Sequence, residues 1–180
     1  MRETRTGGIA EFNKAMRRWL GADLNDWVVE KHKEIHIQVL NGMVYACPVG
    51  NPDEWLSRGA YSDISGGPTG KVKFKRAAPD GYTGGRARGG FQSSTTTPQG
   101  DDPNRIDPSG AAPKAEGRAV MQTLKPWSHS YITNNVEYIL ALNDRPNPNY
   151  PGKGWSKQAP LQWMEAEVEK VENWFKAGVI

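Results

Sequence analysis

Two histidines, His32 and His36, carry the clearest chemical pattern in the chain because they lie four positions apart. On a helix this spacing puts two imidazoles on one face, where both can bind a zinc ion. The glutamate stands at Glu34 rather than directly after the first histidine, so the metalloprotease pattern is absent. A zinc site needs further ligands, and His129 is distant in the sequence. We therefore expect a solvated helix face, no metal and no other cofactor.

Other catalytic patterns are incomplete. Residues 66–71 resemble a phosphate-binding loop, but the pattern requires glycine where Ser65 stands and serine or threonine where Val72 stands. Cys47, the single cysteine, precedes a proline and has apolar neighbours, so we expect a packed thiol and no intrachain disulfide. The sequence thus predicts a protein that is not an enzyme.

One segment concentrates positive charge. Residues 71–92 hold six basic side chains against the single acid Asp80, with Tyr82 and Phe91 between them. The basic residues are Lys71, Lys73, Lys75, Arg76, Arg86 and Arg88. Basic and aromatic side chains on glycine-rich backbone are typical of sequence-independent contact with nucleic acid. A solvated hairpin is the alternative interpretation.

The elements that carry these residues differ between the ends and the middle of the chain. The 180 residues carry a formal charge of +3, and most of the 20 glycines and 13 prolines lie between positions 48 and 117. The two ends are patterned and the middle is irregular, which argues against a helix bundle, a repeat array or a large α/β enzyme. The polar first residues and the lack of a long apolar run predict no signal peptide and no membrane contact.

A long N-terminal helix is predicted over residues 8–44. Its apolar residues recur at steps of three, four or seven and form one stripe: Phe12, Met16, Leu20, Leu24, Val28, Ile35, Val39 and Met43. Gly21 is a candidate break, with Asp23 or Asn25 as a new N-cap. Such a helix is longer than the remaining chain can cover. We therefore expect part of the stripe to meet a neighbouring subunit.

The middle of the chain is predicted to be mostly loop. Residues 71–76 alternate with period two and are a candidate strand, and residues 89–96 are a weaker one. Residues 99–115 have too little apolar surface to offset their ordering entropy, so they are predicted to be a flexible excursion. If this segment is ordered, we expect the order to come from outside its own chain.

Regular structure is predicted again towards the C-terminus. We expect a short helix over 119–124, a strand over 128–133, a short helix over 135–142 capped by Asn134, and a final helix over 161–177. Gly178 stands where a C-terminal cap belongs. The seven tryptophans require either a tryptophan-rich core or apolar surfaces that partners cover.

Together these patterns predict an α+β fold in one domain, 1–180. Its elements are a long N-terminal helix (region 8–46), short strands, further short helices and a C-terminal helix. Region 48–118 contains the long Gly/Pro-rich loops and the hairpin, and region 119–180 the C-terminal α+β part.

Four ordered motifs carry a resemblance to a known family. Residues 47–52 with Trp55 resemble its TPVGNP..W, and residues 81–88 its GYVGGRLR. Residues 131–138 resemble its YITNNLPYA, and residues 154–160 its GWSKQAP. The motif residues singled out are Pro48, Gly50, Pro52, Trp55, Gly81, Tyr82, Gly84, Gly85, Asn134, Asn135, Tyr138, Trp155, Gln158 and Pro160. The family is that of the neck, or tail-completion, proteins of long-tailed bacteriophages, also called head–tail joining or minor tail proteins.

The resemblance implies a fold in which the long N-terminal helix packs on a small, mostly antiparallel sheet with further short helices. It also implies a virion structural protein without catalytic activity, assembled in the host cytoplasm. Such a protein joins the head connector to the tail tube of a siphophage as a ring around the DNA channel, expected to be a hexamer. Its implied partners are itself, head-completion proteins and tail-tube or tail-terminator proteins, and packaged DNA contacted without sequence preference. Glycines 81, 84, 85, 89 and 90 would permit positive φ and close backbone approach, as in a loop threaded between subunits.

Two insertions separate this chain from the family pattern, over residues 57–78 and after Tyr138. Three other interpretations remain open from the sequence. The chain is a sequence-independent DNA-binding protein acting alone, a tail terminator or minor capsid protein, or a metal-dependent enzyme built on His32 and His36.

Overall fold

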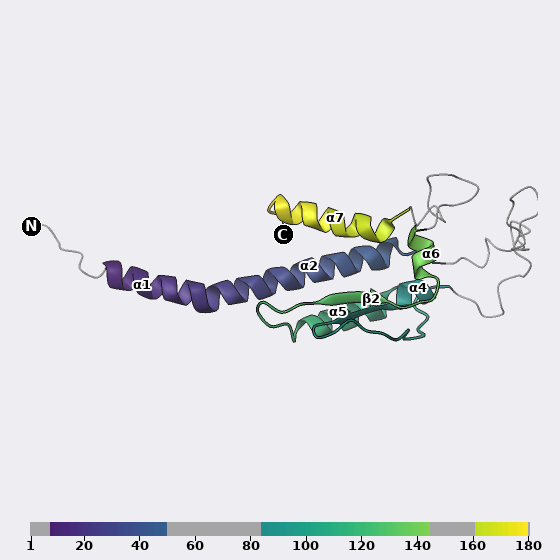
Figure 1. The fold of residues 1–180 in the computed structure, drawn as a ribbon, viewed down its shortest axis with the longest axis horizontal. Coiled ribbons are helices and arrows are strands. Elements are labelled where there is room, and N and C mark those ends of the chain that lie inside the picture. The colour runs from purple at the N-terminus through teal and green to yellow at the C-terminus, as the bar shows by residue number, and fades with distance from the viewer. Residues whose placement is uncertain (1–7, 50–83, 145–160, 180) are drawn as a thin grey trace, which may run out of the picture.

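A computed structural model of the chain describes residues 8–49, 84–144 and 161–179, and the fold is α+β (Figure 1). The helices are α1 (Gly8–Arg18), α2 (Leu24–Ala46), α4 (Arg86–Gly89), α5 (Ala111–Met121), α6 (Ile139–Asp144) and α7 (Trp163–Lys176). The strands are β1 (Phe91–Ser94) and β2 (Tyr131–Asn134), which pair antiparallel with Phe91 opposite Asn134.

The predicted N-terminal helix is confirmed and runs without a break into α2. Trp19–Asp23 form a π-helical turn, η1, in which the amide of Leu24 donates to the carbonyl of Trp19. A π turn takes in one extra residue without breaking the helix. The expected break at Gly21 is therefore wrong, and Asp23 makes no side-chain cap.

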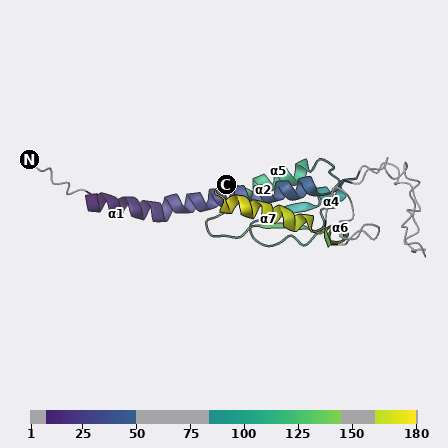
Figure 2. The ribbon, with the colours of Figure 1, turned by 90° about the horizontal axis from the view of Figure 1, so that it is seen from above.

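The helix buries a different face from the one predicted. His36, Leu40 and Val44 are its buried residues, whereas Ile35, Val39 and Met43 of the predicted stripe are half-buried. The reason is that α2 lies between two layers: α7 packs along one side, and the sheet with α5 packs along the other (Figures 1 and 2). A helix covered on both sides buries more than one stripe.

The core lies where these layers meet. It consists of Leu40, Val44, Cys47, Ala87, Phe91, Val136, Ile139 and Trp163. The rings of Phe91 and Trp163 pack edge to face, with centroids 6.3 Å apart at an interplanar angle of 83°. Burial of these side chains supplies most of the stabilisation at roughly 25 cal/mol per Å2 of apolar surface.

Residues 99–115 are held by their own chain, so the predicted flexible excursion is wrong. The Arg105 guanidinium donates to the carbonyls of Gly89 and Phe91 and pairs with Glu116. The Asp107 carboxylate accepts from the amides of Ser109, Gly110 and Ala112. Polar contacts, rather than apolar burial, thus order this segment, and nothing outside the chain is required.

Helix α5 begins eight residues before the predicted helix at 119–124 and ends before Pro126, as expected. Asp107 satisfies amides at its start, and Pro113 falls in the first turn, where a missing N–H costs no helical hydrogen bond. Gly117 lets the helix approach α2, since a Cβ there would lie 2.3 Å from Leu40 Cδ2.

The two strand predictions that fall on described residues are confirmed by β1 and β2. The short helix predicted at 135–142 begins later, at Ile139, and Asn134 is the last residue of β2 rather than a helix cap. Its carboxamide oxygen instead accepts from the amide of Val136. The predicted strand at 71–76 lies outside the described residues.

The final helix is confirmed as α7, which runs antiparallel to α2 (Figure 1). Buried Asn143 accepts from the amide of Met164 and donates to the Glu165 carboxylate, which fixes the start of the helix. Gly178, at φ +69°, ends it as predicted.

Candidate functional site: the projecting half of the N-terminal helix

The most conspicuous surface of the protein is the N-terminal half of the long helix, which projects beyond every other described element (Figures 1 and 2). Six large apolar side chains of this half are 37% to 78% exposed. They are Ile9, Phe12, Met16, Trp19, Leu20 and Trp27, which we call the bare stripe. An apolar patch of this size on a protein surface marks an interaction site.

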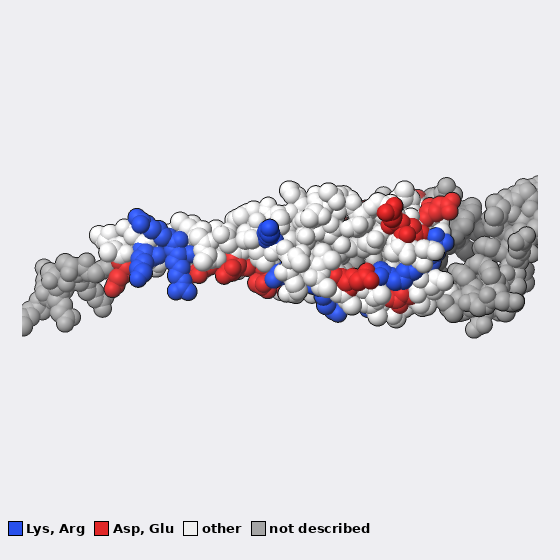
Figure 3. Space-filling model, turned by 90° about the horizontal axis from the view of Figure 1, so that it is seen from below, with Lys and Arg blue, Asp and Glu red and all other residues white. Residues whose placement is uncertain are grey.

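The other side of α1 is mostly basic. Lys14, Arg17 and Arg18 lie on this helix together with Glu11, and Figure 3 shows Lys and Arg side chains gathered near the free end of the long helix. Arg18 lies 3.4 Å from Asp23, in an exposed pair that contributes little stability. Helix α1 is thus amphipathic: its polar side has a net positive charge, and its apolar side has no cover from the described parts of the chain.

Exposed tryptophans extend beyond the helix. Trp127 is 67% exposed and its indole N–H donates to Asn25, while Trp174 on α7 is 37% exposed with Lys170 over its ring. Trp163 is the one described tryptophan in the core. The described tryptophans therefore lie mostly on exposed surface rather than in the core.

His32 and His36 form a hydrogen-bonded chain with two serines rather than a solvated face. Ser130 Oγ lies 2.8 Å from His32 Nε2 and 2.9 Å from His36 Nδ1, and His36 Nε2 lies 3.0 Å from Ser93 Oγ. His36 is only 4% exposed, so the expected solvation is wrong there. The two serines come from the region of β2 and from β1, so the chain ties α2 to the sheet.

The electrostatics of this cluster keep it neutral. Burial, followed by the neighbouring His32, lowers the pKa of His36 to about 4. Burial and nearby His129 lower the pKa of His32. His129 is thus close in space although distant in the sequence. Among the described residues, no three histidine, cysteine or acidic side chains are placed to hold a metal ion.

Cys47 is packed as predicted. It is fully buried, and burial raises the pKa of its thiol to about 12, with Arg88 acting in the opposite direction. A thiol of this kind is protonated and unreactive at neutral pH. Its position at the end of α2 is structural.

The two described arginines of the basic segment have different surroundings. Arg88 donates to the carbonyls of Cys47, Tyr45 and Pro108, so its guanidinium holds the end of α2. Arg86 is exposed and pairs with Asp102 at 2.8 Å, which raises the pKa of the guanidinium and lowers that of the carboxyl. Lys71, Lys73, Lys75 and Arg76 lie outside the described residues.

The described glycines on either side of these two arginines have two different roles, positive φ and close packing. Gly84 and Gly85 have φ of +70° and +90°, and a Cβ on Gly85 would lie 2.4 Å from the Pro108 nitrogen. Gly89 and Gly90 instead permit close packing, with a Cβ on Gly90 lying 2.5 Å from a methyl of Val136. This segment forms a helical turn, α4, packed inside the chain.

The described motif residues contact one another across the fold. Arg88 bonds to Cys47, beside Pro48, and the Asn134 amide donates to the Ala87 carbonyl at 2.7 Å. Asn135 donates to the carbonyls of Gln99 and Asp101 and ties down the loop before α5. Tyr138 follows β2 and is 42% exposed. Gly50, Pro52, Trp55, Gly81, Tyr82, Trp155, Gln158 and Pro160 lie outside the described residues.

Sequence reasoning missed Arg105, Asp107 and Asn143, each of which bonds to backbone groups that begin or join elements. The signal for Asp107 was present, since Asp and Ser shortly before an alanine-rich run are typical of a helix start. The partners of Arg105 and Asn143 are distant in the sequence, and no local pattern indicates them.

None of the described helices combines the length and apolar character that crossing a membrane demands. Compared with models of known protein families, with curated proteins and with solved structures, the chain has no match. Evidence for its function therefore comes from the structure and from the sequence motifs.

Proposed function

We propose that the protein is a structural component of a siphophage neck that joins the head connector to the tail tube as a ring around the DNA channel. The observation that carries the proposal is the bare stripe on the projecting helix. A stable protein that leaves six large apolar side chains exposed on one helix needs partners to cover them. In a ring, each subunit meets two neighbours and supplies that cover.

The contacts between motif residues are a second support. Three of the four motifs that resemble the neck family have described residues, and those residues meet where the end of α2, α4 and the end of β2 come together. Arg88 and Asn134 both bond to backbone carbonyls there. Motifs that join distant segments into one unit fit a structural protein, in which a shared framework matters more than a reactive group.

The ring would leave the described arginines with modest roles in DNA contact. Arg88 donates hydrogen bonds to three carbonyls of its own chain, and Arg86 forms an ion pair with Asp102. No described residue of this segment favours the rival proposal of a DNA-binding protein acting alone. If the channel face of the ring is basic, other residues would supply its positive charge.

Analytical ultracentrifugation, with the purified protein alone and then with siphophage tail tubes added, tests the proposal. We expect the protein to sediment with the tubes and to form a ring at the tube end. A protein that ignores tubes at all concentrations but binds DNA tightly, with affinity that falls steeply with salt, would overturn it.

A further inference from the structure

Trp27, the last residue of the bare stripe, lies on a face of the long helix that α7 borders further along. At 3.6 residues per turn, Trp27 shares this face with Gln38, Gly42 and Tyr45, which are three to five turns away. These three residues line a groove with α7, and a Cβ on Gly42 would meet the Glu167 carboxylate of α7. Tyr45 is 87% exposed, so α7 leaves part of this face open.

The direction of α7 defines what fits beside it. It runs antiparallel to α2, and its C-terminal end points along the face towards α1 (Figures 1 and 2). A second helix that continues the line of α7 in the same direction runs antiparallel to α1. It must be apolar on one side and about 20 residues long, at 1.5 Å per residue, to cover the stripe.

We propose that the occupant is the same stripe of a second copy, so that two chains pair antiparallel through residues 9–28 in the free protein. The rigid, continuous helix cannot fold back to cover itself. In the pair, the N-terminus of each α1 meets the C-terminus of the other copy's α7, an arrangement of opposite helix dipole ends that is favourable.

Charge favours the antiparallel direction. Within residues 9–28, the first half carries Lys14, Arg17 and Arg18 against the single acid Glu11, and the second half carries Asp23 and Asp26. Antiparallel pairing about the middle of residues 9–28 lays each basic half along an acidic half. Parallel pairing in register would lay like charges together, which is destabilising.

The area is sufficient for a stable pair. At the exposures of the six side chains, full cover removes up to roughly 800 Å2 from each copy, given the areas such side chains bury. Two copies together would bury about the 1,600 Å2 of a standard specific interface.

The inference goes beyond the proposed function because it describes the protein before assembly. A two-fold pair is closed and cannot by itself extend into a ring. Neck subunits would have to exchange the second copy for a ring neighbour. The pair thus protects the stripe from aggregation until assembly begins.

Sedimentation velocity of three chains tests the pairing. Wild type is expected at twice the chain mass of 19.9 kDa. Met16→Glu puts a carboxylate into the stripe and should raise the Kd of the pair at least about 100-fold, since each pair would bury two unpaired charges. Ala10→Glu adds the same charge on the opposite side of α1 and should leave the pair intact. A wild-type monomer at tens of micromolar, or a Met16→Glu pair as tight as wild type, overturns the inference.

Cysteine cross-linking tests the direction. Antiparallel pairing about the middle of residues 9–28 places position 12 opposite position 25 of the other copy, one residue from position 24. It keeps the two copies of position 12 about 20 Å apart at 1.5 Å per residue. Phe12→Cys and Leu24→Cys chains should form a disulfide when mixed under oxidising conditions and not when oxidised alone. Native Cys47 is fully buried and does not compete. Cross-linking of Phe12→Cys to itself would show parallel pairing and overturn the inference.

These outcomes are separable from the proposed function. A chain that pairs as described but never joins tail tubes contradicts the neck role alone. A chain that joins tubes but is a monomer or a parallel pair beforehand contradicts the pairing alone.

Discussion

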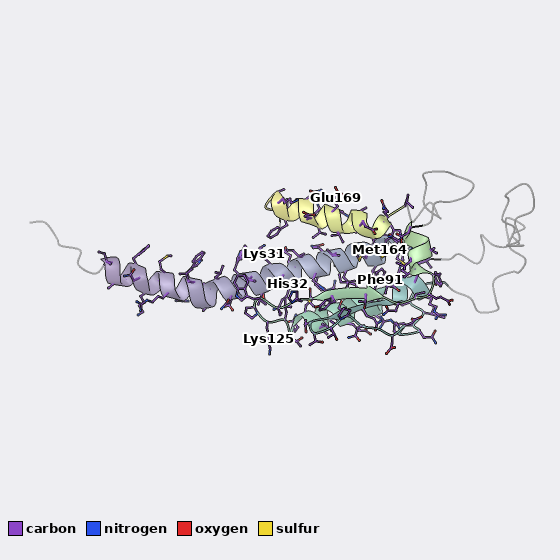
Figure 4. The ribbon with its side chains drawn as sticks, in the orientation of Figure 1. Lys31, His32, Phe91, Lys125, Met164 and Glu169 are labelled. Carbon is purple, nitrogen blue, oxygen red and sulfur yellow. The ribbon has the colours of Figure 1, made fainter. Side chains whose placement is uncertain are left out.

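The two halves of the long N-terminal helix both carry apolar residues at helical spacing, but they differ in exposure. The C-terminal half lies between α7 on one side and the sheet with α5 on the other (Figure 4), and Leu40 and Val44 are each 1% exposed. In the N-terminal half, Phe12 is 61% and Leu20 is 55% exposed. Periodicity therefore predicts an apolar face, but not whether the same chain covers it.

The comparison separates two uses of apolar surface. In the C-terminal half it stabilises the fold, and in the N-terminal half it is available for binding. Substitutions in the two halves should accordingly act on different measurements: unfolding for the first and association for the second.

The largest expected difference is between Leu40→Ala and Leu20→Ala. Leu40 packs in the core against α5 at Gly117, so we expect Leu40→Ala to lower the free energy of unfolding by about 2–5 kcal/mol. Exposed Leu20→Ala should change it by less than about 0.5 kcal/mol under conditions in which the chain is a monomer. Urea unfolding followed by circular dichroism measures both. Equal effects would show that the two halves contribute alike to the fold.

Lowering the pH should reduce the free energy of unfolding, because His36 is buried in its neutral form. The pKa of His36 is about 4 in the folded protein, against an ordinary value of 6.5. The unfolded chain therefore takes up the proton first as the pH falls. Stability is fully present above 6.5 and is lost between 6.5 and about 4, by roughly 3 kcal/mol at 1.36 kcal/mol per pKa unit.

Unfolding free energies measured at pH 7.5, 5.5 and 4.5 check this expectation. His36→Gln keeps a polar side chain without a titrating group and should flatten the dependence over this range. The matched variant His129→Gln alters an exposed residue and should leave most of it. A wild-type stability that is constant from 7.5 to 4.5 would contradict a neutral, buried His36.

Substitution of Arg88 should lower stability more than substitution of Arg86, although both arginines belong to one basic segment. Arg88→Ala leaves carbonyls at the end of α2 without their donors, so we expect a loss of about 1.5–3 kcal/mol of stability. Arg86→Ala breaks an exposed pair with Asp102 and should have a much smaller effect. Thermal unfolding of the two variants, side by side, gives the order directly. An Arg86→Ala variant that is the less stable of the two would be the contrary result.

The smallest expected effect is at Gly21 in the π-helical turn. A Cβ there meets nothing within 4 Å, and alanine favours helix over glycine by about 1 kcal/mol. Gly21→Ala should therefore raise the helical signal of the free chain slightly and leave core stability unchanged. Gly85→Ala, at φ +90° and against the Pro108 backbone, is the contrasting variant and should be clearly destabilising. Circular dichroism at 222 nm with a thermal scan separates them.

Local patterns were enough for the long helix, both strands on described residues and α7, because each depends on periodicity or on cap residues. They were not enough for His36, since its partners Ser93 and Ser130 are 57 and 94 residues away. The start of α5 was missed because Pro113 and Gly110 usually indicate loops, whereas here Asp107 supplies the missing acceptors.

The candidate site was anticipated in part. The described parts of the chain leave the N-terminal half of the helix exposed, whereas the expectation that the whole chain cannot cover it, and the identity of the cover, stay predictions. The buried face predicted for the C-terminal half of the long helix was wrong. Periodicity indicates one apolar side, whereas α2 is packed on two sides. The residues that join α4, the end of α2 and β2 depend on side chains reaching backbone carbonyls across the fold, which no spacing along the chain reveals.

Co-sedimentation with siphophage tail tubes, for wild type, Met16→Glu and Ala10→Glu together, tests the central claim that the bare stripe is the surface through which a neck protein assembles. The account predicts that wild type and Ala10→Glu pellet with the tubes and add a ring at the tube end in negative-stain electron microscopy, while Met16→Glu stays in the supernatant. Equal binding of all three chains would contradict the role of the stripe, and no binding by any of them would contradict the neck function.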